Sequence, residues 1–545
     1  MTDRPGTRRA INQRYPFGTP DGARANLKEI MEGFVGIDDE AADLGDPSDD
    51  LSARIIVGRM GSGKTLYLRR SQAFAANDHA TYADEVRSDL PSTQDVIQVC
   101  HRYKSHLITE TWTAIWRKAL LRALSSHLLY AGQLSSALSL EEHERLTGEY
   151  AALLGRPQTP RSPYVEVAEI IHKHQSCAAL DRYLRHEGWA DLTSHLEAAL
   201  CKSKPVYFFL DAIDEQFAHA PMYWLKFQEG LFYAVMSLLR EPGFGGRLHV
   251  VACVRDIVYS DVLRSEHAGR YRDEPHIRVL NWDTKAIGDL LAAKIAGLGP
   301  AHRMDPGSEG VRGWLGVREI HNPQRDVTEL VEDYVLRHTR LLPRDLVEIG
   351  NALSREVAGA KARGATELAS ERIRAVVDRA AAGFADVQLR ACANQIVADM
   401  MPPNAVAQGY SDVYLGDTEY ARGIVEDLRQ VLAAVQTDRF DGLALHRARA
   451  VASARMNGHV RPDSDLDPGL HVLDVLWQHG LLGYETTQEG AGSVRFSASL
   501  PVNDFHLPLD RRAYVLHPCV GHTVPVRSVG APVLGTDHRA AGRPR

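Results

Sequence analysis

The chain has 545 residues, of which 44% are hydrophobic and 24% are charged, and its formal net charge is -7 at pH 7. This is the composition of an ordinary globular protein. At roughly 150 residues per domain, the length predicts two to four domains and excludes a single small fold. The mildly acidic balance argues against a protein that binds nucleic acid over its whole surface, although a local basic patch is compatible with it.

The cysteines are spaced too widely for a disulfide framework or a cysteine-based zinc site, because no two of them form a Cys-x-x-Cys pair. We therefore expect reduced and mostly buried thiols, as in a cytoplasmic protein. The six are Cys100, Cys177, Cys201, Cys253, Cys392 and Cys519.

The sequence carries neither the pattern of a signal peptide nor that of a membrane span. Its first residues, MTDRPGTRRAINQRYPF, contain arginines without an apolar segment behind them. The longest helix-like apolar stretch, Trp112 to Leu140, is interrupted by charged residues such as Arg117 and Arg122. That pattern is typical of an amphipathic helix rather than of about 20 residues in lipid. We expect a cytoplasmic protein without a membrane partner.

Residues 1–52 are rich in Gly, Pro and Asp, and we expect an N-terminal arm with one short helix near Leu27 to Phe34. Residues 53–300 alternate short apolar runs with helical periods, which predicts an α/β domain with a parallel sheet. After a first strand that begins near Ala53, the expected strands are Asp95 to Cys100, Pro205 to Asp211, Leu248 to Val254 and His276 to Leu280. The expected helices are Thr109 to Tyr130, Leu192 to Leu200, Met222 to Leu239 and Thr284 to Ala296.

Strands are expected to disappear from about residue 325, so residues 301–400 are predicted to form a separate helical domain. Within residues 401–528, a helix at Pro468 to His479 precedes GLLGYETT and SVRFSAS, two short strands separated by QEGAG. A helix followed by such a hairpin is typical of a winged-helix domain. Residues 529–545 are expected to be a disordered tail.

The strongest motif lies between the first strand and the first helix of the α/β domain and fits G-x-x-x-x-G-K-[ST]. Its residues are Gly58, Arg59, Met60, Gly61, Ser62, Gly63, Lys64 and Thr65. Glycines let successive backbone N–H groups converge on phosphates, and the helix N-terminus adds a partial positive charge. Lys64 supplies a cation for the β- and γ-phosphates, and the Thr65 hydroxyl is a ligand for Mg²⁺. The motif predicts binding of ATP with Mg²⁺.

A second motif follows the apolar run Val206 to Leu210, which ends in Asp211. An acid in that position lies at the carboxyl edge of a parallel sheet, so we expect Asp211 to hold Mg²⁺ through water. Asp214 and Glu215 follow closely enough to orient and deprotonate an attacking water. We favour Glu215 as the base over Asp214, and one of the two acids has the alternative role of capping the next helix.

At these residues the chain resembles a known family. FFLDAIDE resembles the second motif of NACHT-type STAND ATPases, which are signal-transducing relatives of the AAA+ class. VVACVRDIVYSDV resembles the strand that ends in a sensor arginine, which implies that Arg255 senses the γ-phosphate. LNWDTKAIGDLLAAKI, HTRLLPRDLVEIGNAL, HGLLGYETT and YVLHP then follow the order of a family of bacterial single-chain P-loop ATPases.

The resemblance covers about residues 53–525 and implies a P-loop NTPase core, a helical lid and a winged helix. Arg344 in LLPRD is implied as a lid contact to the nucleotide, with pairing to Asp345 or Glu348 as the alternative. The interval between Lys64 and Asp211 is long for one crossover between strands, so residues 130–190 are expected to be an inserted helical segment. We expect deletion of such a segment to leave nucleotide binding intact.

These features predict a cytoplasmic Mg-dependent ATPase that uses nucleotide state to rearrange its domains, with slow turnover. The expected partners are a separate protein or other copies of the chain in the ATP state, and a role in bacterial defence or stress is implied only by the resemblance. Three alternatives stay open: an AAA+-like ATPase that acts on nucleic acid, a P-loop kinase, and a scaffold that binds nucleotide but scarcely hydrolyses it. The helix before the hairpin carries no Lys or Arg, which favours internal packing over DNA contact.

Overall fold

The computed structural model describes residues 14–25, 53–87, 90, 96, 100, 103, 106–211, 221–244, 246–400, 418–456, 467–486, 493–497 and 505–529. The expected helix near residues 27–34, the acids Asp214 and Glu215, and the expected tail after residue 529 lie outside the described residues. No helix among the described residues combines the length and the apolarity that a bilayer span needs.

Five parallel strands form the central sheet, in the order β2-β3-β4-β1-β5. They are β1 (Ile55–Gly58), β2 (Tyr82–Ala83), β3 (Val206–Leu210), β4 (Leu248–Arg255) and β5 (Ile277–Val279). The predicted α/β fold with a parallel sheet is therefore confirmed. Because β4 lies between β1 and β3, the carboxyl ends of these three strands meet at one edge of the sheet.

The expected strand Asp95 to Cys100 is wrong, since Val96 and Cys100 are helical. Val96, Cys100 and Tyr103 are buried and recur at the four- and three-residue spacing of one helix face. A short apolar run does not by itself distinguish a buried strand from a buried turn of helix. The edge strand is instead β2, which pairs with β3.

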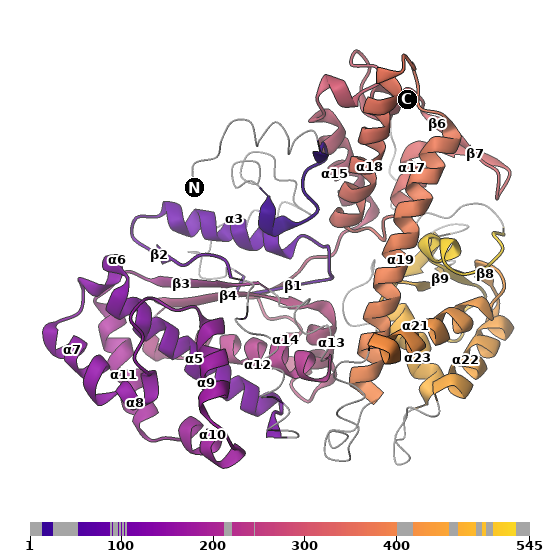
Figure 1. Ribbon diagram of the computed structural model, residues 1–545. Helices are drawn as coiled ribbons and strands as arrows, with labels where there is room; N and C mark the ends of the chain where they lie inside the picture. The colour runs from indigo at the N-terminus through magenta and orange to yellow at the C-terminus, as the bar shows by residue number, and fades with distance from the viewer. Residues whose placement is uncertain are drawn as a thin grey trace.

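Helices cover both faces of the sheet, so alternate strand residues enter two different cores. On one face, α3 (Lys64–Asn77) packs its buried residues Tyr67 and Leu68 against Ile56, Phe209 and Cys253. On the other face, α5 (Thr109–Tyr130) and α12 (Pro221–Leu239) share a core with Val57, Phe208 and Val254. Figure 1 shows α3 above the sheet and α5 and α12 below it.

Residues 130–190 are helical, as expected, but they belong to the core of the α/β domain. The helices are α6 (Gly132–Ser135), α7 (Leu140–Glu144), α8 (Ala151–Leu154), α9 (Pro163–Lys173), α10 (Cys177–Leu184) and α11 (Gly188–Cys201). Leu153 and Ile170 lie in the same buried cluster as Phe208 of the sheet. The Tyr164 hydroxyl donates a hydrogen bond to the backbone carbonyl of Asp211. Deleting this segment would uncover the core, so this packing does not support the expectation that nucleotide binding survives the deletion.

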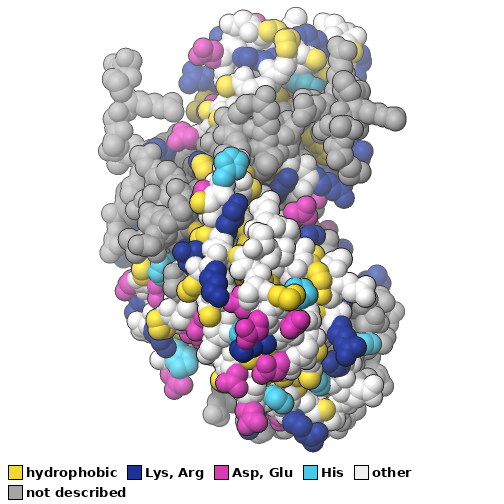
Figure 2. Space-filling view, turned by 90° about the vertical axis from the view of Figure 1, so that its left-hand side faces the viewer, with side chains coloured by type: hydrophobic (Ala, Val, Ile, Leu, Met, Phe, Trp, Pro, Cys, Tyr) yellow, Lys and Arg dark blue, Asp and Glu magenta, His cyan; other side chains and the backbone are white. Residues whose placement is uncertain are grey.

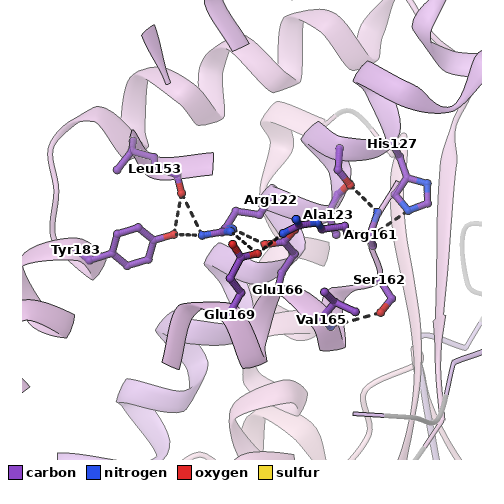
Figure 3. Close-up of polar contacts among 11 residues, drawn as sticks. Arg122, Ala123, His127, Leu153, Arg161, Ser162, Val165, Glu166, Glu169 and Tyr183 are labelled. Atoms are coloured by element: carbon purple, nitrogen blue, oxygen red, sulfur yellow. Dashed lines mark hydrogen bonds and ion pairs between the residues drawn. The ribbon is translucent and has the colours of Figure 1, made fainter. Parts of the chain in front are cut away.

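Arg122 joins α5 to this segment through a buried cluster of polar groups (Figure 3). Its side chain is 0% exposed, and its Nε donates to the Glu166 carboxylate at 2.5 Å. Further contacts run to the Glu169 carboxylate at 3.1 Å and the Tyr183 hydroxyl at 3.2 Å. Burial raises the pKa of Glu166, and the neighbouring Arg122 opposes that rise. The ion pair therefore compensates two charges that cannot reach water.

Between β4 and β5, α13 (Asp256–Arg264) and α14 (Ala268–Tyr271) add Val258, Leu263 and Tyr271 to the core of the α/β domain. A second unit follows the sheet. It contains α15 (Thr284–Ala296), α16 (Gly310–Leu315), β6 (Glu319–Asn322), β7 (Val327–Leu330), α17 (Val331–Arg337), α18 (Pro343–Ala362) and α19 (Ser370–Met400). The antiparallel pair β6 and β7 contradicts the expectation that strands disappear from residue 325. These strands are four residues each and only partly buried, so they lack the apolar run that marks a core strand.

The described part of the N-terminal arm is docked on this second unit. Phe17 is buried against Trp314, with 4.9 Å between the ring centroids, and its N–H donates to the Asn351 side chain at 2.8 Å. A Cβ on Gly350 would lie 2.2 Å from the Phe17 ring. The ring therefore packs against α18 at a position where any residue larger than glycine would clash with it. Arg69 of α3 also donates to the carbonyl of Gly22, at 2.9 Å. The arm therefore contacts both units.

The C-terminal unit combines helices with a four-stranded antiparallel sheet in the order β10-β9-β11-β8. Its elements are α21 (Thr418–Ala433), β8 (Arg439–Phe440), α22 (Gly442–Met456), α23 (Pro468–Gln478), β9 (Leu482–Thr486), β10 (Ser493–Phe496), β11 (Tyr514–Leu516) and the short helix η9 (Pro518–His522). The predicted helix followed by a hairpin is confirmed as α23, β9 and β10. One face of α23 is buried in the core of this unit, with Val472, Leu476 and Trp477 fully enclosed.

We expect Arg122→Met to destabilise the α/β domain by about 3–5 kcal/mol, because it leaves the Glu166 carboxylate buried without its cation. The measurement is the free energy of unfolding from urea titration. Arg145→Met is the matched control, since Arg145 pairs with Glu141 on the surface and should change stability by about 0.5 kcal/mol or less. Equal effects of the two substitutions would contradict the role given to the buried pair.

Candidate functional site

The loop between β1 and α3 has the backbone shape that the glycine pattern predicts. Gly61 and Gly63 have φ values of +91° and +94°, a region that L-residues with a side chain enter only at a cost. Lys64 begins α3, a helix of 14 residues, so the loop leads directly into a helix N-terminus. The Lys64 ammonium donates to the carbonyls of Gly58 at 2.8 Å and of Arg59 at 3.0 Å. The carbonyls of Gly58 and Arg59 thus point toward the Lys64 ammonium.

Asp211 lies directly after β3 and meets the first turn of α3. The Thr65 hydroxyl donates to the Asp211 carboxylate at 2.6 Å, although 146 residues separate the two in sequence. Asp211 is only 7% exposed, and its backbone N–H donates to the Arg87 carbonyl at 2.7 Å. A hydroxyl and a carboxylate are the oxygen donors that Mg²⁺ prefers, and Mg²⁺ commonly keeps most of its waters in such a site. These two residues therefore fit a magnesium ion.

Arg255 ends β4, the strand between β1 and β3, and is paired in register with Gly58. Its backbone N–H donates to the Gln228 side-chain oxygen at 3.2 Å, and its guanidinium lies 5.6 Å from the centroid of the Trp224 ring. Arg255 is buried at the sheet edge that also carries the loop and Asp211. The sheet topology therefore places this predicted sensor between the two motifs.

Arg344 reaches the loop through its backbone. Its N–H, in the first turn of α18, donates to the Gly61 carbonyl at 3.2 Å. A Cβ added to Gly61 would lie 3.1 Å from the Arg344 Cβ, so helix and loop are in close contact. The alternative partner Asp345 is held by another cation, since Arg340 donates to both of its carboxylate oxygens at 2.7 and 2.8 Å. The structure thus brings Arg344 to the loop, with the side chain half-buried beside it.

Arg59, which the motif leaves unspecified, joins the loop to the C-terminal unit. Its guanidinium lies 3.3 Å from the Asp256 carboxylate and donates to the Ser497 hydroxyl at 3.1 Å. The same group donates to the carbonyl of Gln478, the last residue of α23. Burial would raise the pKa of Asp256, but Arg59 and Arg255 outweigh it and lower that pKa below its usual range. The loop, the end of β4 and α23 therefore meet around one partly buried ion pair.

Trp282 is a second contact that the sequence did not single out. Its indole N–H donates to the Ser62 carbonyl at 2.9 Å, and the residue is buried. Neither this contact nor that of Arg59 has a local sequence signal, because their partners are far away in the chain. Asp214 and Glu215, the predicted catalytic acids, lie outside the described residues, so their distance from Thr65 and Asp211 stays a prediction.

No family model, no curated protein and no solved structure matches this chain. The resemblance to NACHT-type STAND ATPases therefore rests on the motifs quoted above, and the geometry of the loop, Thr65 and Asp211 is independent of it.

We expect Gly61→Ala to destabilise the protein more than Gly63→Ala, by about 1 kcal/mol or more. Both substitutions place a side chain at a positive φ, which costs about 1–2 kcal/mol. Only at Gly61 does the new Cβ press on Arg344, whereas nothing lies within 4 Å of a Cβ at Gly63. The measurement is the free energy of unfolding in urea. Equal losses would show that α18 does not rest on the loop.

Proposed function

We propose that this protein is a Mg²⁺-dependent ATP-binding and ATP-hydrolysing switch of the STAND or AAA+-like type. The single observation that carries the proposal is the 2.6 Å hydrogen bond between Thr65, at the start of α3, and Asp211, at the end of β3. It joins a glycine-rich loop, a helix N-terminus and a buried carboxylate at one sheet edge. These are the groups that bind a nucleoside triphosphate together with Mg²⁺.

In this proposal each residue at the edge has one task. Lys64 leaves the loop carbonyls and binds the β- and γ-phosphates, while the loop N–H groups bind the phosphate oxygens. The Mg²⁺ ion, next to Thr65 and Asp211, supplies neutralisation of the phosphate charge. Glu215, or Asp214 in its place, orients the attacking water and accepts its proton. Arg255 stabilises the charge that develops on the terminal phosphate.

A chain of polar contacts links the loop to both other units and supports the switch. Arg340 contacts the Gln388 side chain, which contacts His479 next to the Gln478 carbonyl that Arg59 holds. Burial lowers the pKa of His479 to about 3, so the imidazole is neutral in this chain of contacts. Arg340 and Leu341 have φ values of 45° and 54° directly before α18. Such strain in front of a helix that rests on the loop is suited to a hinge with two arrangements.

The nucleic-acid alternative is less favoured by the position of α23. Every residue of this helix is buried or partly buried, so it offers no exposed face to a DNA groove, and its sequence has no Lys or Arg. In Figure 2, the coloured Lys and Arg side chains are intermixed with Asp and Glu rather than gathered in a basic stripe. The arginines before residue 14 and those after residue 529 lie outside the described residues. We therefore propose protein partners or other copies of the chain before nucleic acid.

We expect Lys64→Ala to weaken ATP binding by about tenfold to a hundredfold, because a charge-assisted contact to the phosphates is lost. Isothermal calorimetry with ATP and Mg²⁺ measures the dissociation constant. Lys285→Ala, which removes an exposed lysine at the start of α15, is the control and should bind as the wild type does. Unchanged affinity of folded Lys64→Ala would exclude the phosphate-loop assignment.

We expect Glu215→Gln to keep ATP binding and to slow phosphate release by about 10²–10⁴-fold, since the amide cannot accept a proton from water. Asp214→Asn should have the smaller effect, and the reverse order would move the base to Asp214.

Phosphate release without any co-substrate in the wild type also separates hydrolysis from the kinase alternative. Light scattering of Glu215→Gln with ATP, with ADP and with added duplex DNA then distinguishes self-association from DNA binding.

A further inference from the structure

Three residues that can ligate a metal ion meet where the second unit contacts the C-terminal unit. His338 follows the end of α17, Asp378 lies on α19, and His522 ends η9. One ligand atom from each residue lies within 4.8 Å of the other two. The cluster is on a different part of the molecule from the loop and Asp211, and the proposed ATPase makes no use of it.

His338 is already oriented as a ligand. Its Nδ1 lies 2.6 Å from the backbone carbonyl of Tyr334, and because a carbonyl only accepts, Nδ1 carries the proton. The lone pair is then on Nε2, the other ring nitrogen. The Tyr334 hydroxyl donates to the Asp378 carboxylate, so one residue positions two of the three side chains. Histidine ligands of metal sites commonly donate their second nitrogen to a carbonyl in this way.

His522 supplies an observation that itself points to a ligand. Its Nε2 is buried and has no hydrogen-bond partner among the described residues. An oxygen of the Asp378 carboxylate is 3.6 Å from this nitrogen, which is beyond hydrogen-bond distance. A buried ring nitrogen that faces a carboxylate across this gap is rare in a native protein unless water or an ion lies between the two.

The cationic side chain next to His338 is compensated. Arg337, which precedes His338 in the chain, is paired with the Glu329 carboxylate. Its charge therefore does not oppose a metal ion in the cluster.

A cavity of about 430 Å³ opens beside the cluster and is lined by His338 and His522 together with His517. His517 is engaged elsewhere, because its Nδ1 accepts from the backbone N–H of Cys519 at 3.2 Å and lies 3.0 Å from the Cys519 sulfur. The cavity gives an ion a path from solvent and leaves room for a water as the fourth ligand.

We propose that His338, Asp378 and His522 bind one divalent transition-metal ion of the Zn²⁺ class, which pins η9 of the C-terminal unit to α17 and α19. Two imidazoles and one carboxylate are a ligand set for zinc and its neighbours, whereas Mg²⁺ and Ca²⁺ prefer oxygen alone. A tetrahedral zinc ion with ligands at about 2.1 Å separates its ligand atoms by roughly 3.4 Å. Binding therefore shortens those separations between the ligand atoms that exceed this value and tightens the contact between the two units.

The test uses the full chain, stripped of metal with a chelator and then titrated with ZnSO₄ alone in a calorimeter. We expect one high-affinity equivalent in the wild type and a higher melting temperature in its presence. Asp378→Asn and His522→Gln keep the size of each side chain, so both variants should fold, and each should weaken that equivalent by about a hundredfold. The zinc-induced rise in melting temperature should be lost with it.

His321→Ala is the matched control, since it removes an exposed histidine of the same unit that lies 3.8 Å from the Asp326 carboxylate. It should bind zinc as the wild type does. Absence of a high-affinity equivalent in the wild type would overturn the proposal, and so would binding that Asp378→Asn and His522→Gln leave unchanged. Zinc binding that an excess of Mg²⁺ displaces would also contradict it, because it would place the ion at Thr65 and Asp211.

Discussion

The carbonyl groups of the loop after β1 impose the constraint on which the arrangement of the units depends. Buried backbone carbonyls need hydrogen-bond partners. The Lys64 ammonium donates hydrogen bonds to the carbonyls of Gly58 and Arg59. The Trp282 indole donates to the Ser62 carbonyl, and the backbone N–H of Arg344 donates to the Gly61 carbonyl. These donors come from α3, from the segment before α15 and from α18. The hydrogen bonds of one short loop thus fix where the second unit sits.

This constraint would let a nucleotide bound at the loop, as proposed, influence elements far from it. Lys64 cannot bind a phosphate and two loop carbonyls with the same geometry, so a nucleotide bound in the proposed way would change the hydrogen bonding of the loop itself. Arg59 belongs to that loop and extends to the end of α23, while α18 rests on Gly61. Both neighbours are rigid helices with packed cores, and packed cores shift between discrete arrangements rather than deforming continuously.

The C-terminal unit contacts the rest of the protein at two separate places, which differ in their chemistry. One is the partly buried ion pair of Arg59 and Asp256 beside α23, at the sheet edge. The other is the cluster of His338, Asp378 and His522, where η9 meets α17 and α19. In the proposed function, a nucleotide would act on the first attachment and the proposed metal ion on the second. Because α19 contributes to both regions, through Gln388 and Asp378, metal occupancy would limit how far the first attachment can move.

The sequence by itself determined the parallel sheet, the glycine-rich loop with its lysine, the position of an acid after an apolar strand, and the helix followed by a hairpin. Each of these depends on contiguous residues, whose periodicity or spacing has one structural meaning. The helical turn at Val96 and Cys100 was missed because a short apolar run fits a strand or a helix, and the β6–β7 pair because its strands are short and half-exposed. Only the tertiary structure brought Arg59 to α23 and His338 to His522, since such contacts join residues far apart in the chain and leave no local pattern. It also decided that residues 130–190 belong to the core, because a helix's own apolar face does not say which neighbour will cover it.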